Sequence, residues 1–337
     1  MVNGTPLSVH TGGIYVWSYL IRRSVHSLIV LFIITSLCFC AMRLMPGNFW
    51  MQAPGLTEED IIYANQQKHL FGLDQPFFKQ YFVWMKQLLR GSLGIDFNYI
   101  PINNYIWKYV SNSLILLGTA FILTLAIAFP WGIHNSKKPN GASDKIGLVL
   151  SLIGYCIPVF VLGHWLQAVF SFQLLWLPPS SMHDPSKVGE FTDLLVHMVL
   201  PVSTLTIGLL AYYLKFFRES MVGIFPSSFL IAARAKGVSE KRVTYRHALK
   251  NGSIPIITVI MLDFPTLISS SAVVENVFNW NGIGTLMVHS VSQRNYPVLI
   301  AIILIIATFV VLANWLADML YVIVDPRVKL SRKISDI

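Results

Sequence analysis

Three carboxylic acids lie inside long apolar stretches of the sequence: Asp263, Glu275 and Asp318. A carboxylate surrounded by hydrocarbon is costly, so such a residue commonly marks a pathway, a gate or a polar bond between helices. Glu275 lies near one end of its stretch, which favours a structural or gating role over contact with a substrate. Asp263 lies deeper, where lining a pathway and bonding to another helix are equally reasonable. Asp263 and Glu275 are therefore candidate pathway or gate residues, whereas Asp318 is expected to cap or pair locally.

Residue types that support enzyme or metal chemistry are present but lack partners at a recognisable spacing. The serine triplet at 269–271 has no histidine or lysine base at such a distance, which disfavours a nucleophilic serine. His164 and His197 each lack a second ligand at helical spacing, and the three cysteines form no CxxC pair. The sequence contains no GxxxxGK[ST] loop, the usual means of holding ATP phosphates. We therefore expect no catalytic residue, metal or cofactor in this chain.

The composition indicates a membrane protein. Hydrophobic residues make up 54% of the 337 residues and charged residues only 12%, whereas about a quarter of the residues of a soluble domain are charged. A transmembrane helix requires about 20 mostly apolar residues. The expected fold class is all-α with about six transmembrane helices, because six stretches meet this length. These stretches are residues 26–45, 110–134, 146–176, 196–214, 254–277 and 297–324.

The distribution of Lys and Arg predicts the orientation of the spans. The N-terminal segment, segments 135–145 and 215–250, and the C-terminal tail together carry 17 basic and 5 acidic residues, while the segments on the other side carry 8 of each. Segments rich in Lys and Arg face the cytoplasm, so both termini are expected there. The net charge of +9 is largely explained by this topology and requires no nucleic acid.

The spans divide the chain into five parts. Tyr15 and Trp17 suggest that the N-terminal leader lies at the cytoplasmic face of the membrane or in its interface. The predicted parts are the leader (1–25), the first transmembrane helix (26–45), an extracytoplasmic segment (46–109), the core transmembrane domain with a cytoplasmic loop (110–324, loop 215–252) and a cytoplasmic tail (325–337).

The extracytoplasmic segment is predicted to fold, because it is too rich in apolar and aromatic residues for a disordered loop. Residues 57–70 are expected to form a helix, since Thr57 and Asp60 resemble a capping box. A second helix is expected over 76–89, because Pro76 suits a first helical turn.

The cytoplasmic loop is predicted to hold two short helices. Pro226 blocks continuation of the preceding helix, and either serine of the pair 227–228 can cap a new helix. This helix covers 229–236 and can end in a left-handed turn at Gly237. A second helix is expected over 239–249, with Ser239 as its N-cap. Such a pair forms a compact surface under the membrane.

The same loop carries the most specific pattern in the sequence. Residues 231–237 read Ile-Ala-Ala-Arg-Ala-Lys-Gly, and the run continues with Ser239, Val243, His247-Ala248-Leu249-Lys250-Asn251 and Pro255. This run resembles the EAA loop of bacterial ABC importer permeases, in the form used by the peptide/nickel branch. Further matching motifs are Leu44-Met45-Pro46-Gly47, Gly91-Ser92-Leu93-Gly94, Gly282-Ile283-Gly284 and Asp325-Pro326-Arg327. The chain is most similar to the B-type permease of dipeptide and oligopeptide importers.

The resemblance implies a type I ABC importer permease fold in the bacterial cytoplasmic membrane, with this chain forming half of a pathway for di- or oligopeptides. It implies a second homologous permease, an extracytoplasmic peptide-binding protein, and two cytoplasmic ATPases that hold ATP and Mg. Small residues of the loop would seat its first helix in a groove of the ATPase, and charged residues would contact the same partner. These coupling residues are Ala232, Ala233, Arg234, Ala235, Lys236, Gly237, Glu240 and Arg246.

Several alternatives stay open on the sequence alone. Asp263 stands where this branch commonly carries an amide, so nickel or another metal chelate is an alternative cargo. A six-span channel or secondary transporter would be active from this chain by itself, whereas a permease requires partners. An intramembrane protease is the enzyme-class alternative, and it would need a base for the serine triplet at 269–271.

Overall fold

The computed structural model describes residues 11–44, 57, 58, 62, 66 and 75–324. Helices dominate these residues, which also form an isolated antiparallel bridge between Ile95 and Pro101. The predicted all-α fold class is therefore confirmed.

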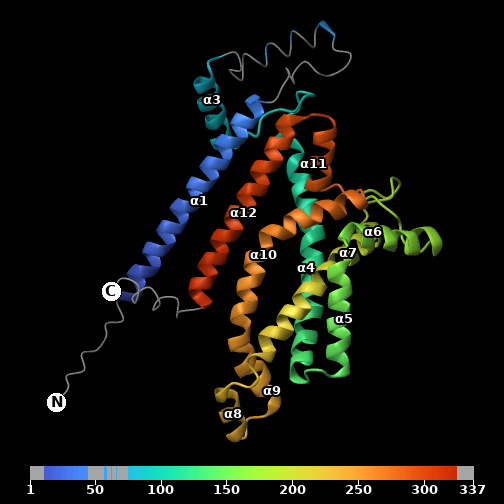
Figure 1. Ribbon diagram of the computed structural model, residues 1–337. Coiled ribbons are helices and arrows are strands. Elements are labelled where there is room, and N and C mark those ends of the chain that lie inside the picture. Colours follow the sequence, from blue (N-terminus) through green and yellow to red (C-terminus); the bar gives the residue numbers. More distant parts are fainter. Residues whose placement is uncertain (1–10, 45–56, 59–61, 63–65, 67–74, 325–337) are drawn as a thin grey trace, which may run out of the picture. The chain divides into compact units, whose positions relative to one another are not determined.

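Within the described residues, four long helices contain segments that are long and apolar enough to cross a membrane. They are α1 (Thr11–Leu44), α4 (Ile106–Lys137), α7 (Phe191–Val222) and α12 (Tyr296–Val324), all visible in Figure 1. A helix bonds every internal backbone group within itself, which a segment surrounded by lipid requires. The apolar segment of α1 is Leu20–Ala41, so it begins before the predicted span at 26–45. The helix itself begins earlier still, at Thr11.

The predicted third span, 146–176, is divided by a sharp bend. Helix α5 (Ala142–Cys156) is followed by α6 (Val159–Leu166) and the π-helix η3 (Gln167–Gln173), and the two helical parts meet at 100°. Pro158 causes the break, since the residue before a proline is pushed towards extended backbone. Ile157 has such a conformation, with φ −86° and ψ 119°.

Helix α10 (Leu249–Val277) has 29 residues and includes the predicted fifth span, 254–277. Several of its side chains between 253 and 270 lie outside the described ones. A tight turn leads from α10 to the short helix α11 (Ile283–Ser292), which stands beside α4 in Figure 1.

The described part of the segment 46–109 is folded. Helix α3 (Phe77–Leu89) confirms the second predicted helix there, with Pro76 at the N-cap position. The loop that follows is closed by Asp96, whose Oδ1 accepts hydrogen bonds from the amides of Asn98 (2.8 Å) and Ile100 (2.9 Å). Most of the first predicted helix, 57–70, lies outside the described residues.

The chain separates into two compact units by its internal contacts. Of the described residues, one unit contains 11–34, 219–265 and 307–324, and the other contains those between 35 and 218 together with 266–306. The larger unit has a core of buried apolar side chains from α4, α6, α7 and the end of α10. Trp280 is fully buried there and donates a hydrogen bond from Nε1 to the Asn112 carbonyl (3.0 Å), which ties the turn after α10 to α4.

Candidate functional site

The loop at 215–252 contains the predicted short helix. Helix α8 (Ser228–Ala235) begins one residue earlier than predicted and ends before Lys236. Gly237 has φ +77°, and its amide donates to the Arg234 carbonyl (2.9 Å), so the predicted left-handed stop is confirmed. Ser227 occupies the N-cap position, but its hydroxyl makes no capping hydrogen bond. The helix is too short to be stable by itself, so packing must hold it in place.

One face of α8 is already used inside this chain. Leu230 is fully buried, and α8 packs against the π-helix η4 (Val243–Ala248). Ala233, one turn after Leu230, is half-buried on the same side. This chain covers part of Ala233, and its contact with an ATPase stays a prediction.

The opposite face of α8 is open and carries small residues. Ser228, Ala232 and Ala235 are exposed and lie at helical spacings of four and three. Phe229 and Ile231 flank them and are 43% and 57% exposed. We call these five residues the outward face of α8. Sequence reasoning missed the two apolar residues of this face, because nothing but the burial of Leu230 fixes which side of so short a helix points outward.

Two predicted contact residues pair with each other. Arg234 Nε lies 2.7 Å from Glu240 Oε1, and the two side chains are 36% and 67% exposed. This ion pair joins the two sides of the Gly237 turn. An exposed pair contributes at most about 1 kcal/mol, so it positions the turn more than it stabilises the fold. Lys236 and Arg246 are exposed cations on the same loop.

The second predicted helix does not stop near Leu249. Ser239 is the N-cap of α9 (Glu240–Arg242), which continues through η4 into α10. The helical path is therefore continuous from Glu240 to Val277. A π-helical turn with a wider backbone spacing occurs in it at η4, a feature often found at functional positions.

Glu275 is fully buried and bonded within this chain. Its Oε2 accepts a hydrogen bond from the Gly284 amide (2.7 Å), and Ser271 Oγ lies 3.3 Å from Oε1. Gly284 is in the first turn of α11, where amide groups have no partner in their own helix and an anion is favoured. The geometry makes Glu275 an anchor for the start of α11. This is a structural role, which the sequence favoured together with gating over contact with a substrate. Asp263 is half-buried on α10, and its role in a pathway stays a prediction.

Two glycines leave the space that this anchor needs. A Cβ at Gly282 would lie 2.4 Å from Glu275 Oε2 and 2.5 Å from Ser113 Oγ. A Cβ at Gly284 would lie 2.3 Å from the Ala272 Cα. The Gly-Ile-Gly motif is therefore a steric requirement of the packing between α10 and α11.

The other polar residues singled out in the sequence make ordinary bonds. Asp318 forms an ion pair with Arg23 of α1, a partner far away in the sequence rather than a local one. His164 Nδ1 lies 3.0 Å from Gln167 Oε1, and His197 Nδ1 lies 3.0 Å from the Asp193 carbonyl oxygen.

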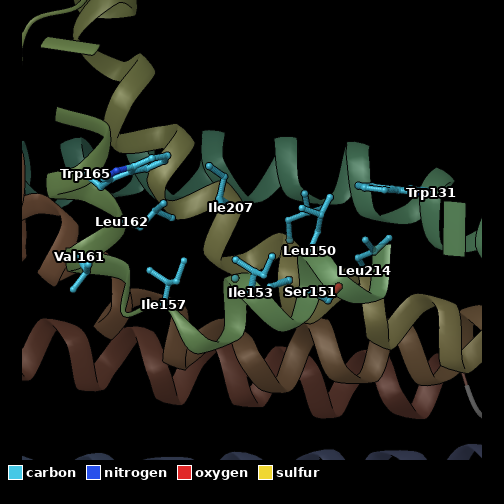
Figure 2. Close-up of a pocket in the computed structure, with 13 residues that line it drawn as sticks. Trp131, Leu150, Ser151, Ile153, Ile157, Val161, Leu162, Trp165, Ile207 and Leu214 are labelled. Carbon is cyan, nitrogen blue, oxygen red and sulfur yellow. The ribbon is translucent and has the colours of Figure 1, made fainter. Parts of the chain in front are cut away.

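The larger unit also contains an apolar cavity of about 640 Å³. Figure 2 shows Trp165 near one end of it and Trp131 near the other, with the side chains of α5 and α6 between them. Neither Asp263 nor Glu275 is among the residues that line it. Ser151 supplies the one hydroxyl of the lining, so the cavity offers no charged group to the termini of a peptide.

A buried ion pair that the sequence did not reveal fixes the C-terminal part of α7. Arg218 donates from Nε to Asp144 Oδ1 (2.5 Å) and from Nη2 to Oδ2 (2.7 Å), and the Asn140 amide donates to Oδ2 (2.8 Å). The Asp144 side chain is fully enclosed, while that of Arg218 is 16% exposed. The Arg218 guanidinium holds the pKa of Asp144 below its ordinary value. This bidentate contact ties the start of α5 to α7.

We expect Asp144→Ala to lower the free energy of unfolding by about 3 kcal/mol, because it removes the carboxylate that makes a bidentate contact with a largely buried guanidinium. The pair contributes fully above the pKa of an unfolded aspartate, about 3.9, and its contribution is lost as the pH falls through the lower folded-state pKa. Thermal unfolding of the purified chain in detergent measures the effect. Lys145→Ala, at the exposed neighbour, is the control and should be neutral. Equal melting temperatures for the two variants would contradict a stabilising pair.

Comparison with known proteins identifies the family. Residues 125–330 match the family model described as "Binding-protein-dependent transport system inner membrane component", and residues 16–128 match the model for the N-terminal part of such components. The chain is 34% identical over 316 residues to the oligopeptide transport system permease protein AppB of Bacillus subtilis, covering 93% of this chain and 99% of that protein. It is 33% identical over 313 residues to the glutathione transport system permease protein GsiC of Pectobacterium atrosepticum, with the same coverage.

A solved structure supports the fold. The chain resembles an inward-facing structure of the MetNI methionine ABC transporter with a TM-score of 0.53 and 15% sequence identity, covering 65% of this chain and 96% of that one. The likeness confirms the predicted type I ABC importer permease fold. On the family model, which spans residues 125–330, and on the close relatives, the chain belongs to the family of inner membrane components of binding-protein-dependent transport systems.

Proposed function

We propose that this chain is the permease subunit of an ATP-driven peptide importer and forms half of its translocation pathway. The observation that carries the proposal is the outward face of α8, where small residues are exposed on a helix that this chain itself holds in place. Relatives named for oligopeptide, peptide and glutathione transport support the cargo class. Those names favour a peptide over a metal chelate.

The proposed mechanism divides the work between subunits. ATP and Mg bind to two partner ATPases. Each ATPase has a groove that receives a short helix of the permease it contacts, which in this chain is α8. Closure of the ATPases displaces α8, and the continuous helix from Glu240 to Val277 carries the displacement into the transmembrane region. The spans then alternate between inward-open and outward-open arrangements. Peptide would reach this pathway from an extracytoplasmic binding protein, and a second homologous permease would form the other half.

The proposal requires α8 to lie in the cytoplasm. It therefore places the N-terminal leader (1–25) and the C-terminal tail (325–337) of this multi-pass chain on the cytoplasmic side of a bacterial inner membrane. The segment 46–109 then lies outside the cytoplasm. The excess of basic residues in the segments assigned to the cytoplasm supports this orientation.

A reporter fusion tests the orientation. An alkaline phosphatase fused after Asp184 should be active, because the enzyme works outside the cytoplasm, and one fused after Lys137 should be inactive. A fluorescent protein that matures in the cytoplasm should give the reverse pattern. If both reporters place Lys137 outside, α8 cannot reach a cytoplasmic ATPase and the proposal fails.

Reconstitution tests the function. Proteoliposomes that contain this chain with its second permease, ATPases and binding protein should import labelled peptide only when ATP is present. Proteoliposomes with this chain alone are the control and should import none. Peptide or ion flux through this chain alone, without ATP, would instead support a channel or a secondary transporter.

A further inference from the structure

Helix α3 is fixed to the outer end of the first transmembrane helix. Phe39 of α1 is completely buried, with ring centroids of Phe77, Tyr81 and Trp84 at 5.3 to 5.4 Å. Ser36 Oγ lies 2.7 Å from the Tyr81 hydroxyl. Ser36 and Phe39 belong to the last two turns of the apolar segment Leu20–Ala41. The packing therefore holds α3 at the height where α1 leaves the membrane.

The side of α3 that faces away from α1 has two parallel strips. Phe78, Phe82 and Leu89 follow one another at helical spacings of four and seven and are 76%, 70% and 82% exposed. The second strip runs beside the first and consists of exposed basic residues at spacings of seven and four: Lys79, Lys86 and Arg90. We call these the aromatic strip, after its two phenylalanines, and the basic strip. The sequence from Phe77 to Arg90 contains no acidic residue.

We propose that α3 lies in the membrane interface, with the aromatic strip among the upper acyl chains and the basic strip on the phosphates of anionic phospholipids. A helix with large apolar side chains on one edge and Lys or Arg on the next binds such a surface through both groups. The transmembrane segment also has exposed apolar side chains in its last turns, such as Leu37. If α3 were exposed to water instead, the two phenylalanines of the aromatic strip would stay unburied. If it bound an acidic protein, the aromatic strip would have no apolar contact.

Spin-label accessibility in nanodiscs tests the placement of α3. The three native cysteines are replaced by alanine, and single cysteines at Phe82, Lys86 or Gln80 carry the label in a chain assembled with its partner subunits. A label at 82 should collide with oxygen more than with a water-soluble nickel chelate, and one at 86 should do the reverse. Gln80, half-buried within this chain, is the control and should be shielded from both reagents.

The lipid charge is tested by repeating the measurement with and without phosphatidylglycerol in the bilayer. The preference for oxygen at 82 should be stronger with the anionic lipid, and the combined variant Lys79→Glu, Lys86→Glu and Arg90→Glu should remove this difference. Nickel accessibility at 82 equal to that at 86 would show a watery surface and overturn the proposal. Shielding at 82 from both reagents that appears only with the binding protein or the second permease would assign the strip to a protein partner, which also overturns it. The same result in both bilayers would refute the role of the basic strip.

Discussion

Replacing Ala232 with glutamate is expected to abolish peptide uptake while the chain still inserts into the membrane at the normal level. Ala232 is exposed at the centre of the outward face of α8, on the side away from the buried Leu230, so the substitution leaves the packing of Leu230 in place. At a close contact with an ATPase it adds both bulk and a carboxylate without a partner, whose burial is costly. Because about 1.4 kcal/mol corresponds to a factor of ten in Kd, association with the ATPase should weaken at least about tenfold. Co-purification of the ATPase and uptake of labelled peptide measure the two effects.

Matched variants separate coupling from folding. Ala232→Ser keeps a small side chain and should transport normally. Gly237→Val should also stop transport, because φ +77° is strained for a branched residue by about 1 to 3 kcal/mol even though no atom lies within 4 Å of the new Cβ. Gly237→Asn should be much milder, since asparagine tolerates this conformation. If Ala232→Glu and Gly237→Val both assemble normally and import peptide at the wild-type rate, the assignment of α8 as the coupling helix is wrong.

Gly284→Ala is expected to destabilise the membrane domain by at least about 3 kcal/mol, at the upper end of the cost of overpacking a core. The new methyl group would lie 2.3 Å from the Ala272 Cα and 2.4 Å from its Cβ, so backbone has to move. That movement would also separate the Gly284 amide from Glu275. The amount of chain recovered from the membrane and its melting temperature in detergent should both fall strongly.

Gly118→Ala is the control for this prediction. Gly118 lies inside α4, and a Cβ there meets no atom within 4 Å. Alanine should be neutral or slightly stabilising at that position, because it is the better helix former. The double variant Gly284→Ala with Ala272→Gly should recover part of the loss. A Gly284→Ala chain that melts at the wild-type temperature would mean that α10 and α11 do not approach as closely as described.

The spans could be predicted from the sequence because lipid demands length and low charge, and both are visible locally. The bend at Pro158 was not anticipated, since an apolar stretch of 31 residues, 146–176, meets the length test whether it is straight or bent. The left-handed turn at Gly237 was predictable, because a glycine after a short helical pattern is a local signal.

The parts of the site that depend on tertiary packing could not be predicted. Which face of α8 points outward depends on Leu230, and a helix of eight residues is too short for its apolar spacing to decide this. Asp144 and Arg218 are 74 positions apart, so no local pattern links them. The anchoring role of Glu275 needed the fold, although a glutamate followed by Gly-x-Gly at the start of a short helix is a signal that could have suggested it.

The break between α5 and α6 has a consequence for where water can enter. Fifteen residues of α5 rise only about 22 Å, less than the roughly 30 Å of hydrocarbon in a bilayer, so the break lies at membrane depth. Pro158 has no amide hydrogen, and the Gly154 carbonyl therefore loses the partner that a continuous helix would give it. A backbone group of this kind is tolerated at such depth only inside protein or beside a hydrated space. The surface around Ile157, which lines the cavity in Figure 2, must then be shielded from acyl chains, either by a neighbouring subunit or by water in the translocation pathway.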